Sequence, residues 1–508
     1  MSSLYIIPKS WKWATLEEIT DTTSGGTPKR TNKDYWNGSI NWLKSGELND
    51  GYINAVQETI TEEGLKKSSA KVFEAGTLLM AMYGATVGRL GILKVDTSTN
   101  QAVCAIFNRF NLFNNEYVFF YLKYTRQQML EDSFGGAQPN LSQGYINNIT
   151  IPFAPLNEQK KIVTKIEKIF SNLDNSDKYL IHLEKQLKRY RQSVLKSAFE
   201  GKLTREWREK QTNLESSLEL LEKIKIERIE YIDLEVRKKF KDKTEKWITE
   251  KVKKEVDKFY NNLKPINNEE KPFTIPNKWS WVRLNELSKK ITDGTHHSPV
   301  NLPIGEFKYI TAKHIKNNEI IFKDLTYVTE KVHNEIYSRC NPEYGDLLLI
   351  KDGATTGVCT INTLEEEFSM LSSVALIKNF SNINSKFILN FLKSSVLNTL
   401  IRRDMKGVGI TRITLTQLKS FIFPTCSLLE QIEIVKEIEK HTSIINKLET
   451  VVQKSVKESK RLRQSILKQA FEGKLVEQDS YDESAEILLE KIAKAKEEYK
   501  KALKRNKK

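Results

Sequence analysis

The chain has 508 residues, which is too long for a single hydrophobic core and predicts roughly two to four domains. Its 39% of hydrophobic residues exclude a chain that is disordered throughout, and no apolar run approaches the roughly 18 residues that cross a bilayer. The net charge of +16 favours a polyanion as partner, although lysine-rich solvated helices give the same balance.

The start of the chain and its cysteines both indicate a reducing cytoplasm. The first residues, MSSLYIIPKSWKW, lack the basic stretch followed by a long apolar one that marks a secretory signal. The cysteines lie far apart without CxxC or zinc-like spacing, so we expect buried free thiols. They are Cys104, Cys340, Cys359 and Cys426.

The first 155 residues of the chain return in its second half. Residues 7–19 read IPKSWKWATLEEI, and residues 275–287 read IPNKWSWVRLNEL. In the same order, GTLLMAMYGATVGRLGI at 76–92 parallels GDLLLIKDGATTGVCTI at 345–361. Repetition at a nearly constant offset predicts two tandem copies of one unit.

Each copy is expected to begin with a compact mixed α/β domain. Short apolar runs such as TLLMAMY, DLLLIK and ITIPF alternate with Gly, Asn and Pro, which is typical of strands and turns. We expect helices at residues 116–130 and 384–403. The two domains, 1–155 and 273–427, have an ordinary size of about 150 residues.

A long helix is expected after each domain, over residues 156–204 and 428–476. Apolar residues recur from Ile162 at spacings of three, four and seven, which is an a/d heptad seam interrupted at Ser176. About 47 residues at 1.5 Å each make a rod of about 70 Å. The predicted seam consists of Ile162, Ile166, Ile169, Leu173, Leu180, Leu183, Leu187 and Tyr190, and of Ile434, Ile438, Ile445, Leu448, Val452, Leu462 and Ile466.

Both ends of these helices carry local signals. Pro155 can open the first helix, and the stretch from Ser427 to Glu430 fits a capping box for the second. Gly201 and Gly473 can end them as left-handed C-caps.

One helix cannot bury such a seam alone. Two copies most naturally pack about a pseudo-two-fold axis, which predicts an intramolecular antiparallel coiled coil with one globular domain at each end. In that arrangement RQSVLKSAFEGKL at 191–203 and RQSILKQAFEGKL at 463–475 recur because the molecule has two equivalent helix ends. The alternative is that each helix folds back on its own domain.

Charged segments follow both long helices. ESSLELLEKI at 215–224 returns as ESAEILLEKI at 483–492. We therefore expect a charged helical connector over 205–272 and a shorter charged helical tail over 477–508. The apolar face of the connector is a candidate partner surface.

A basic protein with two heads at a fixed spacing suits a duplex read at two separated stretches. Because the heads differ outside their shared frame, the target is expected to be asymmetric and bipartite. The chain as a whole resembles the specificity (S) subunit of a type I restriction–modification system. The resemblance rests on the IPxxW-W starts, the GATVGRLG and GATTGVC turns, GGAQPNLSQGYINNITIPFAPLNEQKKI at 135–162, the repeated helix ends and the ESxxxLLEKI segments. GVGITRITLTQLKSF at 407–421 is a divergent second version of the GGAQPN region.

The resemblance implies a division of labour. Each head would be a target recognition domain for one half-site. The helices would set the spacing and dock two modification subunits, which bind S-adenosylmethionine and methylate one adenine in each half-site. A restriction subunit, when present, adds ATP-driven translocation and cleavage. The S subunit itself would perform no catalysis and hold no cofactor of its own.

Motifs that suggest chemistry have simpler interpretations. Residues 341–344, Asn-Pro-Glu-Tyr, differ at the third position from the Asn-Pro-Pro-Tyr loop of adenine methyltransferases, and their repeat partner is a turn before a strand. The turns at 84–88 and 353–357 lack the Gly-Lys-Ser/Thr ending of a P-loop, so we expect tight turns between strands. No cluster with metal-ligand spacing accompanies the histidines, so no metal is expected.

Candidate DNA contacts are polar loop residues that differ between the copies, because a shared frame cannot encode two different half-sites. In the first head they are Lys29, Arg30, Lys44, Tyr83, Arg89, Gln138 and Asn140. In the second head they are His296, His297, Lys313, His314, Lys351, Arg402, Arg403 and Arg412.

Two other classes of function stay open at this point. The chain could be a self-contained DNA methyltransferase or nuclease, against which the missing nucleotide and cofactor loops argue. It could also be a coiled-coil nucleic-acid-binding scaffold, although two elaborated heads exceed what a spacer needs.

Overall fold

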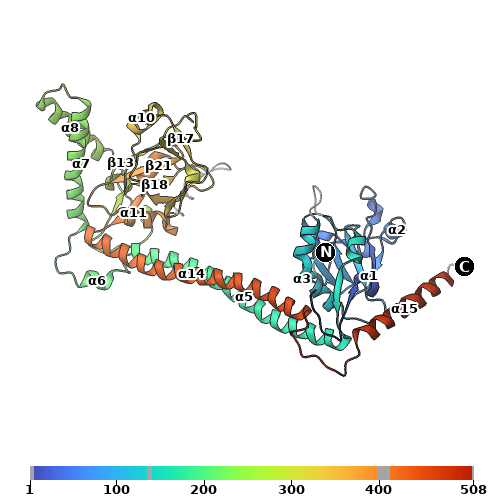
Figure 1. The fold of residues 1–508 in the computed structure, drawn as a ribbon. Helices are drawn as coiled ribbons and strands as arrows, with labels where there is room; N and C mark the ends of the chain where they lie inside the picture. The colour runs from blue at the N-terminus through green and yellow to red at the C-terminus, as the bar shows by residue number, and fades with distance from the viewer. Residues whose placement is uncertain (1–4, 134–139, 398–411, 506–508) are drawn as a thin grey trace. The chain divides into compact units, whose positions relative to one another are not determined.

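The structure is a computed structural model that describes residues 5–133, 140–397 and 412–505 (Figure 1). The chain forms two compact units, Met1–Ile181 with Gln453–Lys508, and His182–Val452. Each unit contains one globular head of mixed α/β structure, as the repeat predicts, and each is described by itself.

The head of the first unit is built on two mixed β-sheets and a two-stranded ribbon. The five-stranded sheet has the order β2-β10-β7-β8-β4, the four-stranded sheet has the order β5-β3-β9-β6, and β1 pairs with β11. The strands are β1 (Lys12–Thr15), β2 (Asp21–Ser24), β3 (Trp36–Leu43), β4 (Gly51–Ile53), β5 (Glu58–Ile60), β6 (Val72–Phe73), β7 (Leu78–Ala81), β8 (Leu90–Leu93), β9 (Thr97–Thr99), β10 (Val103–Phe107) and β11 (Thr150–Phe153).

Short helices and one long helix cover these sheets. They are α1 (Leu16–Ile19), η1 (Lys33–Tyr35), η2 (Ser45–Glu47), α2 (Glu62–Lys66), η3 (Gly84–Thr86), α3 (Asn115–Ser133) and α4 (Gln143–Asn147). The helix predicted at 116–130 is confirmed as α3. Its buried face, which includes Tyr117, Val118 and Leu122, packs in the main core of the head.

The second head keeps the same frame with different additions. Its four-stranded sheet has the order β13-β21-β18-β19, a three-stranded sheet has the order β17-β14-β20, and β12 pairs with β22 as β15 pairs with β16. The strands are β12 (Ser280–Arg283), β13 (Ser288–Asp293), β14 (Phe307–Ile310), β15 (Ile315–Lys316), β16 (Glu319–Ile320), β17 (Thr326–Val328), β18 (Leu347–Ile350), β19 (Cys359–Ile361), β20 (Phe368–Met370), β21 (Val374–Asn379) and β22 (Ile422–Thr425).

Its helices show that the second predicted helix is interrupted. They are η4 (Asn268–Glu270), α9 (Leu284–Leu287), η5 (Ala312–His314), α10 (Glu330–Arg339), α11 (Ser385–Leu392) and α13 (Leu415–Ser420). The helix expected over 384–403 is interrupted, because α11 ends at Leu392 with Lys393 as its cap, and the chain turns there before residues 395–397 become helical again. Residues 398–403 of that prediction lie outside the described residues.

The repeated Glu-Gln pair fastens each head to its long helix. Glu158 accepts a hydrogen bond from the indole of Trp11 at 2.9 Å, and Glu430 accepts one from Trp279 at 2.8 Å. The neighbouring Gln159 accepts the backbone N–H that precedes α3 and donates to a carbonyl before its own helix. Gln431 makes the same two contacts in the second copy. The tryptophan and the Glu-Gln pair therefore recur because they form the same buried joint between head and helix in each copy.

The long helices are α5 (Leu156–Phe199) and α14 (Leu428–Phe471), each of 44 residues. Gly201 and Gly473 follow them with φ of +70° and +69°, which confirms the predicted left-handed caps. The capping box is only half formed, because Ser427 caps the Glu430 amide while the Glu430 carboxylate is bound to Trp279.

Within each unit, segments of α5 and α14 lie side by side and run antiparallel. In the first unit Arg463 binds Asp174 at 2.8 Å and Asp177 at 2.9 Å. In the second unit Arg191 binds Asn446 at 2.8 Å and Glu449 at 2.9 Å. The arginines of the two RQS motifs are thus equivalent residues that contact equivalent partners on the other long helix.

The predicted seam is buried mainly at the ends of the helices. Ile162 and Ile166 belong to the core of the first head, and Ile434 and Ile438 belong to that of the second. Leu187, Ile445, Val452 and Ile466 are also buried, whereas Ile169, Leu173, Leu180 and Leu183 are partly buried. Tyr190, Leu448 and Leu462 are exposed. Each long helix therefore packs on its head as well as on its helical neighbour.

The charged segments form helices that dock on the heads. The connector contains α6 (Arg205–Glu209), α7 (Ser217–Lys239) and α8 (Glu245–Asn261), and the tail contains α15 (Ala485–Arg505). α15 packs on α1 in the first unit, and the Lys496 ammonium donates to the carbonyls of Glu17 and Thr20.

Candidate nucleic-acid interface

The glycine-flanked turn predicted between two strands exists in both heads. In each head the residue before it pairs with the segment that precedes the last short helix, at Asn140 or Arg412. β7 and β8 are antiparallel neighbours joined by the turn at 84–88, and β18 and β19 are joined by the turn at 353–357. Gly84 and Gly353 have φ of +73° and +105°, a conformation that an L side chain strains to adopt. The residues before these glycines form isolated antiparallel bridges, Tyr83 with Asn140 and Asp352 with Arg412. Equivalent backbone positions therefore present different side-chain pairs in the two heads.

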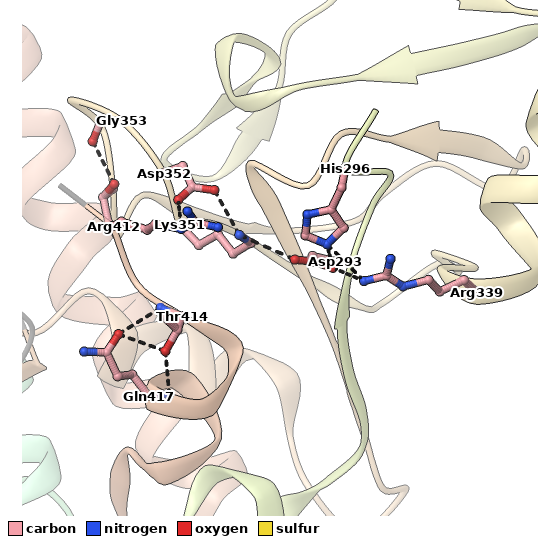
Figure 2. Close-up of polar contacts among 10 residues, drawn as sticks. Asp293, His296, Arg339, Lys351, Asp352, Gly353, Arg412, Thr414 and Gln417 are labelled. Carbon is pink, nitrogen blue, oxygen red and sulfur yellow. Dashed lines mark hydrogen bonds and ion pairs between the residues drawn. The ribbon is translucent and has the colours of Figure 1, made fainter. Parts of the chain in front are cut away.

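In the second head this bridge belongs to a cluster of charged side chains (Figure 2). The Arg412 guanidinium forms an ion pair with Asp352 at 3.0 Å, and the ammonium of Lys351 lies 2.9 Å from Asp352. Lys351 is only 2% exposed and also lies 3.4 Å from the equally buried Asp293. Burial of the Lys351 charge is tolerated because two carboxylates surround it.

Asp293 extends the cluster toward solvent on its other side. Its carboxylate binds Arg339 at 2.6 Å and His296 at 3.3 Å, and Arg339 also lies 3.2 Å from that imidazole (Figure 2). The side chains of Arg339 and Arg412 are 51% and 62% exposed. The buried Asp293 and the partly exposed Asp352 therefore hold two guanidinium groups that keep N–H donors in solvent. Such donors fit phosphate oxygens and the acceptor edge of guanine.

The equivalent place in the first head is almost uncharged. Ser24 occupies the position of Asp293. Ser24 pairs with Cys104 in β10, and Asp293 pairs with Ala375 at the equivalent place in β21. The buried Met82 takes the place of Lys351, since each precedes the bridge residue. A phenol and an amide, Tyr83 and Asn140, replace the Asp352–Arg412 pair.

Other charges of the first head are held near this turn. Asp50 receives two guanidinium N–H groups of Arg126, one of them at 2.7 Å, and the Leu90 amide at 3.1 Å. Burial alone would raise the pKa of Asp50, but these donors and the Arg126 charge outweigh it and lower the pKa. Arg89 lies in the same turn with an exposed side chain.

A second polar group of the first head lies on its four-stranded sheet. Arg30 binds Glu58 at 2.5 Å and stacks over Trp36 with 3.8 Å to the ring centroid. Lys44 forms an ion pair with the same carboxylate. These two cations lower the pKa of Glu58 against the opposing effect of its burial.

The structure places the predicted DNA-binding residues in three groups. It brings together His296, Lys351 and Arg412, and in the first head it brings together Tyr83 with Asn140 and Arg30 with Lys44. Lys29, His297 and Lys313 are exposed without a place in these clusters. Gln138, Arg402 and Arg403 lie outside the described residues.

Two predicted residues are buried, which argues against direct contact with DNA. His314 is fully buried, and its Nδ1 accepts the Thr311 amide at 3.0 Å. Burial lowers the pKa of His314. Lys351 lies beneath the exposed arginines and positions the acidic residues to which they bind.

Sequence reasoning missed Asp293, Arg339 and Asp352. Asp352 stands between a predicted residue and the glycine turn, so its spacing was a usable signal. Arg339 ends α10, which extends beyond the end of its shorter counterpart α2 in the first head, and only the tertiary structure brings it to Asp293.

The remaining chemistry of the described residues is sparse. Within residues 5–133, 140–397 and 412–505, no three His, Cys, Asp or Glu side chains gather as a metal site. All four cysteines are free and buried, as predicted, and burial raises the pKa of Cys104, Cys340 and Cys359 to about 12. Among the helices that the structure describes, none is long and apolar enough to cross a membrane.

Comparison with known proteins gives one family. The family described as type I restriction modification DNA specificity domain matches twice, at residues 8–189 and 276–458. The specificity subunit of the type I restriction enzyme MjaIX from Methanocaldococcus jannaschii is 22% identical over 92% of this chain and 94% of its own length. That of EcoKI from Escherichia coli K12 is 23% identical over 96% and 95%.

A solved structure supports the same fold. A chain from a study of complex assembly and conformational transition of the type I R-M system aligns with a TM-score of 0.67 at 18% identity. The alignment covers 93% of this chain and all of that one.

Proposed function

This chain belongs to the family of type I restriction modification DNA specificity domains, of which it carries two copies, and we propose that each head reads one half of an asymmetric bipartite DNA target. The single observation that carries the proposal is a backbone bridge that both heads share but that carries different side chains in each. Tyr83 with Asn140 and Asp352 with Arg412 occupy one structural position in two chemically different heads. A frame that holds variable polar groups at a fixed place is what two different half-sites require.

The proposed contacts are members of the clusters that reach solvent, together with the exposed Arg89 beside the first turn. In the second head they are His296, Arg339 and Arg412, and in the first they are Arg30, the partly buried Lys44, Tyr83, Arg89 and Asn140. Lys29, His297, Lys313, Gln138, Arg402 and Arg403 stay predictions. Arginine donors would read guanine acceptors, and the Asn140 amide would read adenine.

The long helices are proposed to form one intramolecular antiparallel coiled coil that sets the spacing between the half-sites. The paired contacts of Arg191 and Arg463 support this, because each crosses from one long helix to the other at an equivalent position. The same helices are proposed to dock two modification subunits. Those subunits would bind S-adenosylmethionine and methylate adenine N6, while this chain, in the cytoplasm, contributes no catalytic group.

Methylation mapping tests this assignment. The chain is co-expressed with its modification subunits, with and without replacement of residues 1–155 by the head of a relative, and methylated adenines are located by single-molecule sequencing. We expect a two-part motif of which replacement changes one half alone. Absence of methylation, or a motif indifferent to the replacement, would contradict the proposal and favour a scaffold without sequence specificity.

A further inference from the structure

A basic groove lies between the second head and the α7–α8 hairpin. It has a volume of ≈ 880 Å³ and is lined from α7, α8, β13 and α13, all within the second unit. Eight of its lining residues are lysine or arginine, and two are glutamate. We call this feature the hairpin groove.

Four lysines of the groove are available for an anion. Lys239, Lys258, Lys289 and Lys419 come from four separate elements. Within the part of the chain that the structure describes, none of the four forms an ion pair with a carboxylate. These charges line one extended hollow, so a polyanion bound along it would neutralise several of them at once.

The walls of the groove are held in place by buried packing and hydrogen bonds. The Arg228 side chain is 4% exposed and donates to the carbonyls of Asn285 and Glu286 at 2.9 and 3.0 Å. Its guanidinium also stacks on Phe259 of α8 at 3.7 Å. The hairpin itself is closed by a small core of Val236, Ile248 and Val252. The lysines of α8 are therefore held against the head at a fixed distance.

The first head provides a natural comparison for this groove. Lys290 and Lys419 correspond to Asp21 and Asn147 by strand register and helix capping. Lys289 is the additional residue of a β-bulge and has no counterpart in the first head, where Thr20 takes the place of Ser288. The hollow there, between α15 and the head, is lined by five carboxylates and two lysines. The basic character is consequently a property of the second head and its hairpin, and not of the shared frame.

The position of α13 connects the groove to the candidate interface. Arg412 precedes this helix, and Lys419 lies near its other end. The extended residues between Arg412 and α13, together with the rise along α13 to Lys419, span at most about 17 Å, which corresponds to about five steps of 3.4 Å along a duplex. A duplex bound at Arg412 therefore continues within reach of the groove, which favours nucleic acid over an acidic protein segment.

We propose that the hairpin groove binds backbone phosphates of duplex DNA in the flank next to the half-site of the second head. The inference rests on the proposed function, since it assumes that DNA lies on the Arg412 side. It adds a sequence-independent contact on one flank only. The protein would hence protect the two flanks of its target unequally.

The test uses the full chain assembled with its modification subunits and duplexes that carry the mapped motif. One duplex extends about 25 base pairs beyond both half-sites, and two others are trimmed on one side each. The groove variant is K258Q/K289Q/K419Q. The matched control is K246Q/K253Q/K254Q, which removes the same charge from exposed positions of α8 outside the groove.

We expect the groove variant to bind the extended duplex about tenfold more weakly at 0.15 M salt. The slope of log K against log salt should become shallower by about 0.9 for each lost phosphate contact. Trimming the flank of the second head should abolish the difference between variants, and trimming the other flank should not. The methylated motif should stay unchanged, because phosphate contacts carry no sequence information.

Three results would overturn the inference. They are an unchanged salt slope, equal weakening on the trimmed duplex, and loss of modification subunits from the groove variant in light scattering. The last result would instead assign the groove to an acidic protein segment. If the unaltered protein fails to prefer its mapped motif, the proposed function fails as well, so the two failures are distinguishable.

Discussion

The two heads share one backbone frame but stabilise it with different chemistry. At the centre of the second head, Lys351 and Asp293 form a buried ion pair, where the first head has Met82 and Ser24. At the joint with the long helix, Glu430 is bound by Trp279 and Arg208, whereas Glu158 is bound by Trp11 and the amide of Gln478. The comparison teaches that the two copies share the positions at which side chains contact one another, whereas the charge of those side chains differs.

The joint offers the largest expected effect. Glu430→Gln should destabilise the second unit by about 3 kcal/mol, because it leaves the largely buried Arg208 without its carboxylate. Glu158→Gln should cost less than about 1 kcal/mol, since glutamine still accepts the Trp11 N–H. Burial raises the pKa of Glu158 in any case, so loss of its charge is mild. Urea unfolding followed for both variants measures the difference, and equal losses would contradict it.

The exchanged bridge residues test the division of the target. Arg412→Ala should weaken DNA binding by about 1–3 kcal/mol and relax the motif only in the half read by the second head. Asn140→Ala should act on the other half. Binding titrations and methylation mapping measure both effects, with Lys331→Ala on α10 as an exposed control. Relaxation of both halves by either variant would break the assignment of one head to one half-site.

The free energy of unfolding should depend on pH near 6 in the second unit rather than in the first, because all six histidines lie in the second. The folded protein lowers the pKa of His314, so below the unfolded value near 6.5 the unfolded chain binds an additional proton and stability falls. The loss is up to about 1.4 kcal/mol per pH unit, and stability is recovered as the pH rises above that value. His314→Asn keeps an acceptor for the Thr311 amide and should remove this slope between pH 6.5 and 5.5. Calorimetry at several pH values checks it, and an unchanged slope would assign the response to another histidine.

The smallest effect is expected at the paired arginines of the long helices. Arg463→Ala removes contacts to two aspartates and should cost about 0.5–1 kcal/mol. Arg191→Ala removes one ion pair and one amide contact, and should cost less. Urea midpoints of the two variants provide the measurement. A larger loss from Arg191→Ala would show that the second helix crossing depends more on this position.

The local features of this chain followed from its sequence because short-range geometry determines them. The left-handed caps at Gly201 and Gly473 need only a residue without a Cβ, and the turns at Gly84 and Gly353 need the same freedom between two strands. The repeat itself indicated two heads and two long helices, since segments with the same sequence pattern adopt the same fold. It also selected Tyr83 directly before the first turn, although it missed Asp352 at the equivalent place before the second.

Only the tertiary structure decided which charges meet. Arg339, Asp293 and Lys351 are far apart in the chain, and no periodicity connects them. His314 and Lys351 belong to polar stretches in the sequence, yet the fold buries both. The hairpin groove likewise exists because α8 folds back on α7 beside a strand nearly 30 residues later in the chain. Burial and long-range ion pairing depend on how layers stack, and that arrangement is a property of the whole packed unit rather than of any segment.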